Sequence, residues 1–578
     1  MMNKGVAIQY GDVAPEAKEN FVPKASESKF DTLGQLQKYN LNFPNYANPC
    51  ELYSVVLDGT ASAFPSAPEL ANLGLWSEQL SGDDGYFSEP IVLELESVGQ
   101  YSSQGLTLTF DTFNQIYASK LKIQWFRITE EGTAEIENQE FYPDNALYFC
   151  RKFVENYNKV VITFYSLNMP KNRLKLRAID YGYGTIFYGQ ELRNTKLIQE
   201  IDPISTQISI NTADFTLDSK TDMEYSFQAK QPLSIYFNGK LKATTFVKKS
   251  KRKAKFLWDI QSEDYIGLMD SIPYYGGIYS DITAVDVLSD IFTVAKVPYK
   301  IDDVFLSVKI SGYIPFTTCR EALMQVAFAI QGVVDTSDSD SVKVFALEPE
   351  LKQTIPLKRI MQGQNFTDDE TTTGVELVSH SYTPIEEMVE VYKAVDSGSG
   401  ENILVKFSEP LHELSIADGQ IISSGTNYAL INAGAMCNLA GKKYDHKTIT
   451  HRKNNPKVLA SEIEKVVSIE NATLVSQNNV AYILEKCFDW LTKTQTTNLK
   501  IAEGKHVKYG TPIKWGQFKW GEIKWGQRTP NEVTYDEPVT IGDTIKAETE
   551  YMGTVEGVIT KQSFNLNGNI LIKEAVLK

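Results

Sequence analysis

Cysteine is scarce in this chain and shows no pairing pattern. Five Cys occur among 578 residues, and none belongs to a C-x-x-C pair. An odd number of widely spaced thiols argues against a disulfide framework and against a cysteine-based zinc site. We therefore expect unpaired thiols and assembly in a reducing cytoplasm. The positions are Cys50, Cys150, Cys319, Cys437 and Cys487.

Histidine is equally rare, and no catalytic motif surrounds it. All five His follow residue 379, and the sequence has no HExxH, no P-loop, no GxSxG and no GxGxxG in a βαβ context. We therefore predict no enzyme activity, no catalytic residues, no metal and no cofactor. In "YDHKTITHRK" (444–453), Asp445, His446 and His451 lie close together. A solvated polar loop is our preferred interpretation, and a metal site is the alternative.

Long apolar runs and excess basic charge are also missing. No run of about 18 apolar residues exists, so we expect no membrane span. The first residues lack the apolar core of a signal peptide, so we expect no ordinary secretion. The net charge of -16 argues against stable nucleic-acid binding. The basic stretch "KKSKRKAK" (248–255) is interpreted as a solvated hairpin tip, with a polyanion patch as the alternative.

What the sequence does contain is a β pattern rich in aromatic residues. Short alternating segments such as "PIVLELE" (90–96), "KLKIQWFRI" (120–128) and "KVVITFY" (159–165) are separated by Gly, Pro, Asn or Asp. This spacing predicts a β-sandwich over residues 41–188. We interpret residues 1–40 as an extended, partly ordered arm.

The rest of the chain alternates β regions with a few helices. A β region over 189–262 contains an Asn238-Gly239 hairpin turn, and an α+β unit follows over 263–350. Apolar periodicity predicts two helices in that unit, at 283–296 and 318–332, and a third at 478–493 inside the β region 351–578. In the second helix, Thr318 and Glu321 have capping-box spacing, and Gly332 fits the left-handed stop. Asn567-Gly568 marks a terminal hairpin.

Several stretches of the second part carry a family resemblance. They are "EIDPISTQISINTADFTLDS" (200–219), "QPLSIYFNGKLKATTFV" (231–247), "SEDYIGLMDSIPYYGG" (262–277), "TCREALMQVAFAIQGVVDTSDSDSVKVFAL" (318–347) and the last 37 residues from "GDTIKAETEY" (542–551) onward. With them, residues 190–578 resemble the hub proteins of phage tail tips and baseplates, including those of phage-tail-like bacteriocins. The resemblance implies a mainly β fold with small α+β insertions, in which two β-barrel-like domains flank the α/β unit.

The hub resemblance also implies partners and a location. Family hubs are homotrimers that form a pseudo-hexameric ring and join a sixfold tail tube to a central spike. The implied partners are a tail-tube or distal tail protein, the spike and the tape-measure protein. The implied location is the virion, at the tail tip or baseplate, after assembly in the host bacterial cytoplasm. An acidic channel lining would repel DNA phosphates and help their passage.

The N-terminal sandwich resembles a galactose-binding-like jelly roll of the discoidin type. The stretches "LDGT" (57–60), "LWSEQLS" (75–81), "SSQGLTLTFD" (102–111) and "MPKNRLKLRAIDYG" (169–182) carry this likeness. It implies host attachment through a surface glycan, and bracing of the baseplate is the alternative. The expected carbohydrate-binding residues are Trp76, Asp83, Asp84, Tyr86 and Phe87. An extracellular carbohydrate-binding adhesin is the second candidate function, and a cell-wall hydrolase is the third.

Three Lys-Trp-Gly units repeat every five residues within 508–528. Five residues match neither the helical period nor the strand period, so successive Trp side chains would alternate between strand faces. We interpret the segment as an extension of the second β region that packs against a neighbouring subunit. A sugar- or lipid-gripping loop is the alternative. The expected interface residues are Lys514, Trp515, Lys519, Trp520, Lys524 and Trp525.

Overall fold

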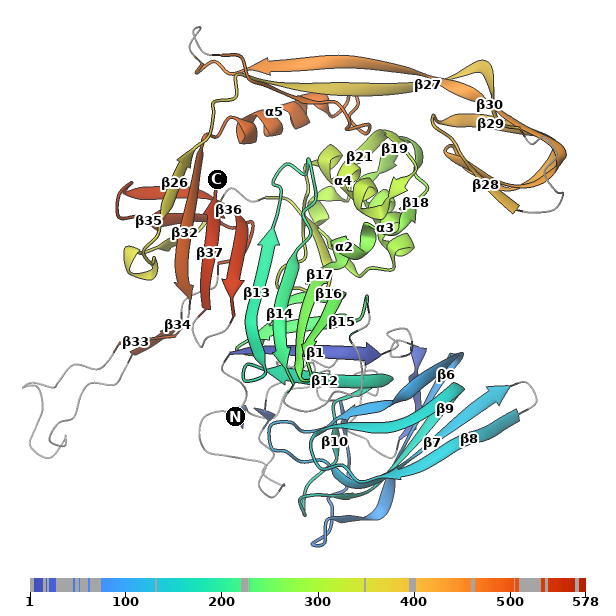
Figure 1. Ribbon diagram of the computed structural model, residues 1–578, viewed down its shortest axis with the longest axis vertical. Coiled ribbons are helices and arrows are strands. Elements are labelled where there is room, and N and C mark those ends of the chain that lie inside the picture. Colours follow the sequence, from blue (N-terminus) through green and yellow to red (C-terminus); the bar gives the residue numbers. More distant parts are fainter. Residues whose placement is uncertain are drawn as a thin grey trace, which may run out of the picture. The chain divides into compact units, whose positions relative to one another are not determined.

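The computed structural model describes most of the chain, and the statements below concern the described residues. They are 5–13, 17, 20–26, 45–46, 51, 61–62, 74–129, 132–219, 227, 229–347, 350–393, 402–458, 463–503, 505–508, 532–535, 539–566 and 571–578. The fold is mainly β with small α insertions, as predicted (Figure 1).

The chain divides into two compact units. The first comprises Met1–Arg193, Thr216–Lys242 and Phe246–Ile260, and the second comprises Asn194–Phe215, Ala243–Thr245 and Gln261–Lys578. The units therefore do not follow the predicted domain boundaries one for one. The predicted first hub region, 189–262, contributes residues to both.

A six-stranded antiparallel sheet dominates the N-terminal part of the first unit. Its order is β11-β6-β9-β7-β8, with β2 on β6. The registers place Leu93, Ile162 and Ile123 side by side on three neighbouring strands, and all three are fully buried. Apolar residues at every second position thus build the core on one face of the sheet. The bounds are β2 Val22–Ser26, β6 Tyr86–Thr109, β7 Ala118–Thr129, β8 Gly132–Phe141, β9 Leu147–Leu167 and β11 Ala178–Asp180.

Smaller strand pairs complete this region. Strand β5 pairs with β10 in an antiparallel two-stranded sheet, and β3 pairs with β4 in parallel. Leu75 of β5 and Leu176 of β10 belong to the same apolar core as the large sheet. The β5/β10 pair therefore covers part of that core. The bounds are β3 Asn45–Tyr46, β4 Ala61–Ser62, β5 Leu75–Trp76 and β10 Lys175–Leu176.

The start of the chain is a strand within a sheet. Strand β1, Val6–Val13, lies between β12, Gly182–Tyr188, and β15, Pro232–Phe237, and pairs antiparallel with both. Ile8 and Tyr10 have no exposed surface. Part of the expected extended arm is therefore an inner strand, because its alternating apolar residues are buried.

The predicted Asn238-Gly239 hairpin is present between β15 and β16, Lys240–Ala254. Asn238 has φ 49° and Gly239 has φ 78°, as a tight hairpin turn requires. The basic stretch 248–255 mostly continues β16, and the turn to β17, Leu257–Glu263, comes only at Lys255 and Phe256. Strand β14, Thr212–Asp218, follows β17 in the sheet order, and β13, Leu192–Glu200, follows β14.

The α/β region of the second unit holds three helices around one apolar core. Thr318 caps α4 by accepting a hydrogen bond from the backbone N–H of Glu321, as expected, but the Glu321 carboxylate accepts from the Thr317 hydroxyl. The expected left-handed stop at Gly332 is wrong by one residue, because Gln331 adopts φ 55°. The bounds are α2 Tyr265–Met269, β18 Pro273–Tyr274, β19 Gly277–Thr283, α3 Ala284–Ala295, β20 Tyr299–Ile301, η3 Asp303–Phe305, β21 Lys309–Ile314, β22 Thr317–Thr318, α4 Cys319–Ile330, β23 Val333–Asp335 and β24 Val342–Phe345.

A second sheet region joins the beginning and the end of residues 194–578. Strand β36 pairs with β13, with β37 and with β35, while β32 connects β37 to β26. Strand β25 pairs with β35 in parallel. The bounds are β25 Leu351–Ile355, η4 Leu357–Arg359, β26 Asn365–Asp368, β32 Gln495–Glu503, β33 Lys505–Lys508, β34 Glu532–Tyr535, β35 Thr544–Glu548, β36 Thr554–Asn565 and β37 Leu571–Leu577.

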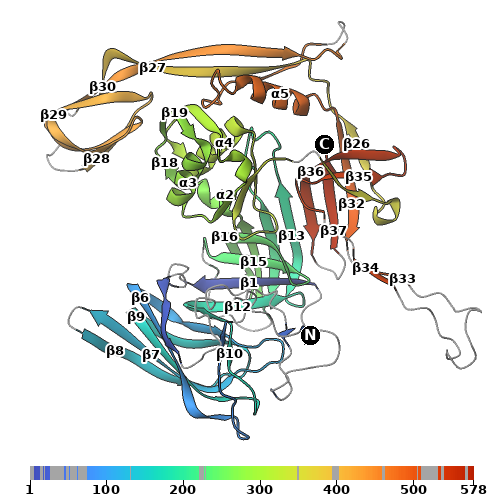
Figure 2. The ribbon, with the colours of Figure 1, turned by 180° about the vertical axis from the view of Figure 1, so that it is seen from behind.

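A long two-stranded ribbon of β27 and β30 runs over helix α5 (Figure 1). At its far end β28, β29 and β30 curl around a small apolar cluster (Figure 2). The ribbon corrects one expectation: residues 444–453 form part of strand β30 rather than a solvated loop. The bounds are β27 Gly374–Lys393, β28 Asn402–Lys406, β29 Leu411–Ser424, β30 Tyr428–Asn454, β31 Val466–Ile469 and α5 Val480–Leu491.

Candidate functional site

Three of the five expected carbohydrate-binding residues lie together on an exposed turn of the first unit. Asp84 accepts a hydrogen bond from the backbone N–H of Tyr86 at 3.0 Å, and Asp83 pairs with Lys171 at 2.6 Å. Tyr86 is 52% exposed at the start of β6. One aromatic ring and two carboxylates are thus accessible at this end of the sheet.

The other two expected residues are buried. Phe87 belongs to the main apolar core, since its side chain alternates inward from that of Tyr86. Trp76 is 2% exposed, and the Nζ atom of Lys175 lies 4.7 Å from its ring centroid. Neither ring presents a face on which a sugar could stack in this structure. The set is therefore divided between surface and core, and sugar binding at the turn stays a prediction.

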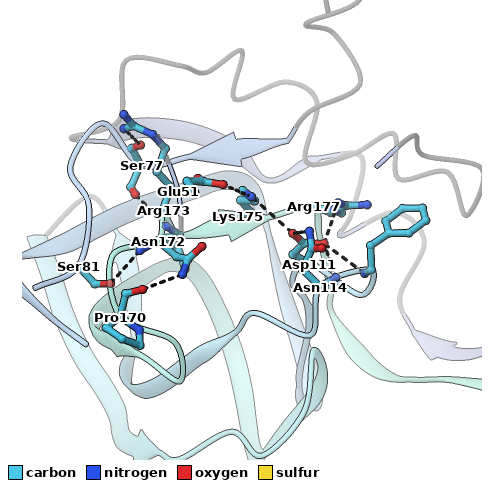
Figure 3. Close-up of polar contacts among 12 residues, drawn as sticks. Glu51, Ser77, Ser81, Asp111, Asn114, Pro170, Asn172, Arg173, Lys175 and Arg177 are labelled. Carbon is cyan, nitrogen blue, oxygen red and sulfur yellow. Dashed lines mark hydrogen bonds and ion pairs between the residues drawn. The ribbon is translucent and has the colours of Figure 1, made fainter. Parts of the chain in front are cut away.

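Lys175 belongs to a buried network of four charges (Figure 3). Lys175 Nζ lies 2.6 Å from Glu51 Oε2 and 3.5 Å from Asp111 Oδ2. Arg177 Nη2 lies 3.1 Å from Asp111 Oδ1. Each of the four side chains is 3% exposed or less. Two cations and two carboxylates therefore neutralise one another in the interior.

The position of each charge follows from the local chain. Lys175 lies on β10 and Arg177 one residue beyond it, so both side chains leave the chain on the same face. Asp111 follows the end of β6, where its carboxylate accepts hydrogen bonds from the Asn114 side chain at 2.9 Å and from the Phe113 backbone N–H at 3.1 Å. The turn after β6 thus places the Asp111 carboxylate next to the two cations.

Electrostatics keep Asp111 ionised despite its burial. Burial by itself would raise the pKa of its carboxyl group, but the charges of Arg177 and Lys175 and the hydrogen bonds of Asn114 outweigh this effect. The pKa of Asp111 is therefore lowered. A buried ion pair that loses one partner leaves an uncompensated charge, which is strongly destabilising. We conclude that the network fixes this end of the unit.

The same network region holds the exposed turn in place. Ser81 donates its backbone N–H to Asn172 O, and the Asn172 side chain donates to Pro170 O at 2.7 Å. Arg173 Nη1 donates to Ser77 O at 2.9 Å. These contacts bind the segment after β9 to the segment before β6 (Figure 3). The turn with Tyr86 is therefore anchored by polar contacts on its inner side.

Sequence reasoning missed this network. Glu51, Asp111 and Lys175 are far apart in sequence, and ion pairs between such positions leave no local pattern. One signal was available: in "RLKLRAID" (173–180), Lys175 and Arg177 alternate with apolar residues in the two-residue period of a strand. Leu174 and Leu176 are also fully buried, so both faces of this segment are interior.

The other expected sites give a mixed outcome. The Lys-Trp-Gly residues, Lys514, Trp515, Lys519, Trp520, Lys524 and Trp525, lie outside the described residues. His446 and His451 both lie on β30, and within the described parts of the chain no group of three or more His, Cys, Asp or Glu could hold a metal ion.

Burial raises the pKa of Cys319 to about 11 and that of Cys487 to about 12, so both are thiols at neutral pH. No described helix is long and apolar enough to cross a membrane.

Comparison with known proteins gives matches to solved structures alone. No protein-family model matches the chain, and no curated protein matches it. The fold is similar to a 43 kDa tail protein of prophage MuSo2 from Shewanella oneidensis, with TM-score 0.39 and 10% identity over 68% of this chain and 95% of that one. It is similar to a tail protein from Neisseria meningitidis, with TM-score 0.38 and 10% identity over 67% and 91%. A third match is prophage tail protein gp18 from Listeria monocytogenes, with TM-score 0.37 and 12% identity over 69% and 91%.

Proposed function

We propose that this chain is a structural hub of a phage tail tip or baseplate, or of a phage-tail-like particle. The observation that carries the proposal is the order of elements in residues 194–578. A β region comes first, the α/β region with α2, α3 and α4 is inserted next, and the chain then returns to β structure. This order agrees with the sequence stretches that resemble hub proteins.

The pairing of β13 with β36, the last strand but one, supports a rigid structural body. Lys196 of β13 pairs with Asn565 of β36, and Glu200 pairs with Lys561. The side chains of Lys561 and Glu200 also form an ion pair at 2.7 Å. Because these strands lie near opposite ends of residues 194–578, their pairing joins the chain before the α/β insertion to the chain after it in one sheet. Such pairing suits a protein that transmits load between neighbours.

The proposed assembly is a homotrimer that joins the tail tube or distal tail protein to the central spike, with the tape-measure protein as a further partner. The net charge of -16 supports a channel lining past which DNA slides without binding. The location is the virion, after assembly in the host bacterial cytoplasm. No catalytic role is proposed, and clearing of host cell wall in a zymogram would contradict this.

Light scattering on the purified full chain tests the assembly. We expect a mass three times that of one chain, with a concentration-dependent fraction of monomer. A strictly monomeric chain at all concentrations, together with its absence from purified particles, would reject the hub.

A second role is proposed for the exposed turn of the first unit, namely attachment to a host-surface glycan. The observation that favours it is the accessible ring of Tyr86 beside Asp83 and Asp84. Aromatic rings stack on sugar faces, and carboxylates accept hydrogen bonds from sugar hydroxyls. A glycan array with the full chain and with Tyr86→Ala tests it. Binding that is lost in the variant supports attachment. Binding that Tyr86→Ala leaves unchanged would reject this turn as the site, and no binding by the natural chain would leave the sheet a bracing element.

A further inference from the structure

Two histidines of the ribbon are in direct contact. His380 on β27 and His446 on β30 have Nδ1 and Nε2 atoms 3.0 Å apart, and their rings are nearly parallel at 10°. The strand register explains the contact, because His446 lies directly opposite Tyr382, two residues from His380 on the same face. The ring of Tyr382 stacks on His446 with a centroid distance of 4.5 Å.

Hydrogen bonding fixes which nitrogen carries each proton. His380 Nε2 lies 3.2 Å from the backbone carbonyl oxygen of Glu470, which can only accept, so this nitrogen is the donor. Neutral His380 must then accept at Nδ1, and His446 must donate from Nε2. A chain of two hydrogen bonds therefore runs from β30 through β27 to the segment after β31. These bonds attach the part of the ribbon around His380 and His446, which we call its root, to the segment after β31.

One added proton preserves these two hydrogen bonds, and a second proton breaks the bond between the two imidazoles. The first proton enters at His446 Nδ1, which takes no part in the contact, and His446 still donates from Nε2. A second proton has to enter at His380 Nδ1. Two N–H groups and two positive charges would then face each other across 3.0 Å. Because neither nitrogen could accept, the contact would open.

Most of the charges around the pair are already engaged with other groups. A pocket of about 640 Å³ beside the pair is lined by charged residues from three further segments, which contribute Asp270, Arg320 with Glu321, and Glu470. Arg320 of α4 is already bound to Ile208 O and to Asp270, and Glu321 accepts from Thr317.

Other charges near the root come from further elements. On β30, Asp445 pairs with Lys447 at 3.0 Å. The carboxylate of Glu470 is exposed at the pocket rim. From α5, Glu485 pairs with Lys453 further along β30. From β21, the ring of Tyr313 packs on Tyr382 at 5.4 Å.

No described carboxylate forms a hydrogen bond or ion pair with His380. His380 itself is only 7% exposed, so water cannot readily solvate a second charge there.

We propose that His380 and His446 form an acid-sensitive switch at the root of the ribbon. With at most one proton on the pair, the ribbon is fixed to the segment that follows β31. With both imidazoles protonated, the root of the ribbon detaches locally while the rest of the unit stays folded.

The direction of the pH effect follows from His380. Burial, and then the neighbouring His446, lower the pKa of His380 below its ordinary value of 6.5, whereas the bond to Glu470 acts the other way. A lowered folded-state pKa means that the detached form binds more protons. The contact is therefore fully stabilising above pH 6.5 and is lost as the pH falls through the lowered pKa of His380.

Hydrogen exchange of the full chain across mildly acidic pH tests the switch, with rates corrected for intrinsic exchange. We expect protection of the amides around His380 and His446 to fall on acidification, while amides of α4 keep theirs. The informative variant is His446→Gln. Its side-chain amide can donate to neutral His380 Nδ1 and accept from the protonated form, so protection should become independent of pH.

The matched control is His412→Gln, because His412 also bonds across the ribbon, to Ile385 O and Lys443 O, and no histidine contacts it. This variant should keep the acid response of the natural sequence. Unchanged protection of the natural chain in acid, or an undiminished acid response in His446→Gln, would overturn the switch.

Nitrogen chemical shifts of the His side chains in the unsubstituted chain give a second test that needs no folded variant. The expected result is that His380 keeps its proton on Nε2 throughout and takes a second proton, on Nδ1, only below its ordinary pKa of 6.5. Protonation of His380 Nδ1 near pH 6.5 would contradict the switch.

Discussion

At the scale of single residues, Lys175 holds the buried charge network together. It is buried between Glu51 and Asp111 and lies over the ring of Trp76. Lys175→Met keeps much of the apolar stem but removes the charge. We expect the first unit to lose about 3–5 kcal/mol of unfolding free energy, because two buried carboxylates would then share one cation. Denaturant unfolding followed by Trp fluorescence measures this loss.

The control for Lys175 is Lys171→Met, which breaks the exposed pair with Asp83 in the same unit. Solvent screens that pair, so its removal should leave the unfolding midpoint almost unchanged. Equal effects of the two substitutions would show that the buried network does not hold the unit together.

Asp264 leads to a prediction about how the stability of the second unit depends on pH. It caps α2, accepts from Thr336 Oγ1 at 2.6 Å and is fully buried. Burial raises its pKa from 3.8 to about 7, against the opposing effect of its hydrogen bonds. A raised folded-state pKa gives stability that is fully present below 3.8 and is lost as the pH rises through about 7.

Asp264→Asn should be less stable than the natural chain, since an amide nitrogen cannot accept the bonds that Asp264 accepts. It should also lose less stability than the natural chain between pH 5 and pH 8. Thermal unfolding of both proteins at the two pH values measures the difference. Parallel losses in both proteins would rule out Asp264 as the titrating group.

At the scale of elements, the turn between β15 and β16 depends on backbone conformation. Gly239 has φ 78°, in the left-handed region that a side chain disfavours. Gly239→Ala should therefore destabilise the first unit by about 1–2 kcal/mol. Asn238→Gly is the comparison, because glycine adopts positive φ at least as readily as Asn, and the change removes only the hydrogen bond that the Asn238 side chain accepts from the Gly5 N–H at 2.8 Å. If Gly239→Ala leaves the free energy of unfolding unchanged, the turn has relaxed to another type.

Helices and the Asn238-Gly239 hairpin were predictable because their signals are local, whereas the expected Asn567-Gly568 turn lies outside the described residues. The three expected helices agree with α3, α4 and α5 to within one or two residues at each end. Thr318 is the N-cap of α4, as the capping rule predicts, and α5 begins at Val480, where its apolar periodicity begins. The Asn238-Gly239 turn was equally clear.

The ribbon was not predictable from residues 444–453, and the reason is physical. Those residues of β30 are held by cross-strand hydrogen bonds to β27, and many of their side chains stay exposed on both faces. No alternation between apolar and polar residues arises where neither face covers a core. The histidine contact and the buried charges were missed for a related reason, since both depend on pairs distant in sequence.

At the scale of the whole molecule, the Lys-Trp-Gly repeat bears on assembly. We expect the combined change of Trp515, Trp520 and Trp525 to Ala to weaken subunit association, because aromatic rings contribute strongly to buried interfaces. Light scattering of the variant and counting of assembled particles measure the effect. Normal particles with impaired adsorption to host cells would instead identify the repeat as a loop that binds sugar or lipid.

The central claim is that the chain is a trimeric hub at the end of a tail. Electron microscopy of purified particles, with the chain located by a fused density label, tests it most directly. The account predicts three copies around the axis at the distal end of the tail tube. Six copies at that position, or particles that lack the chain, would contradict it.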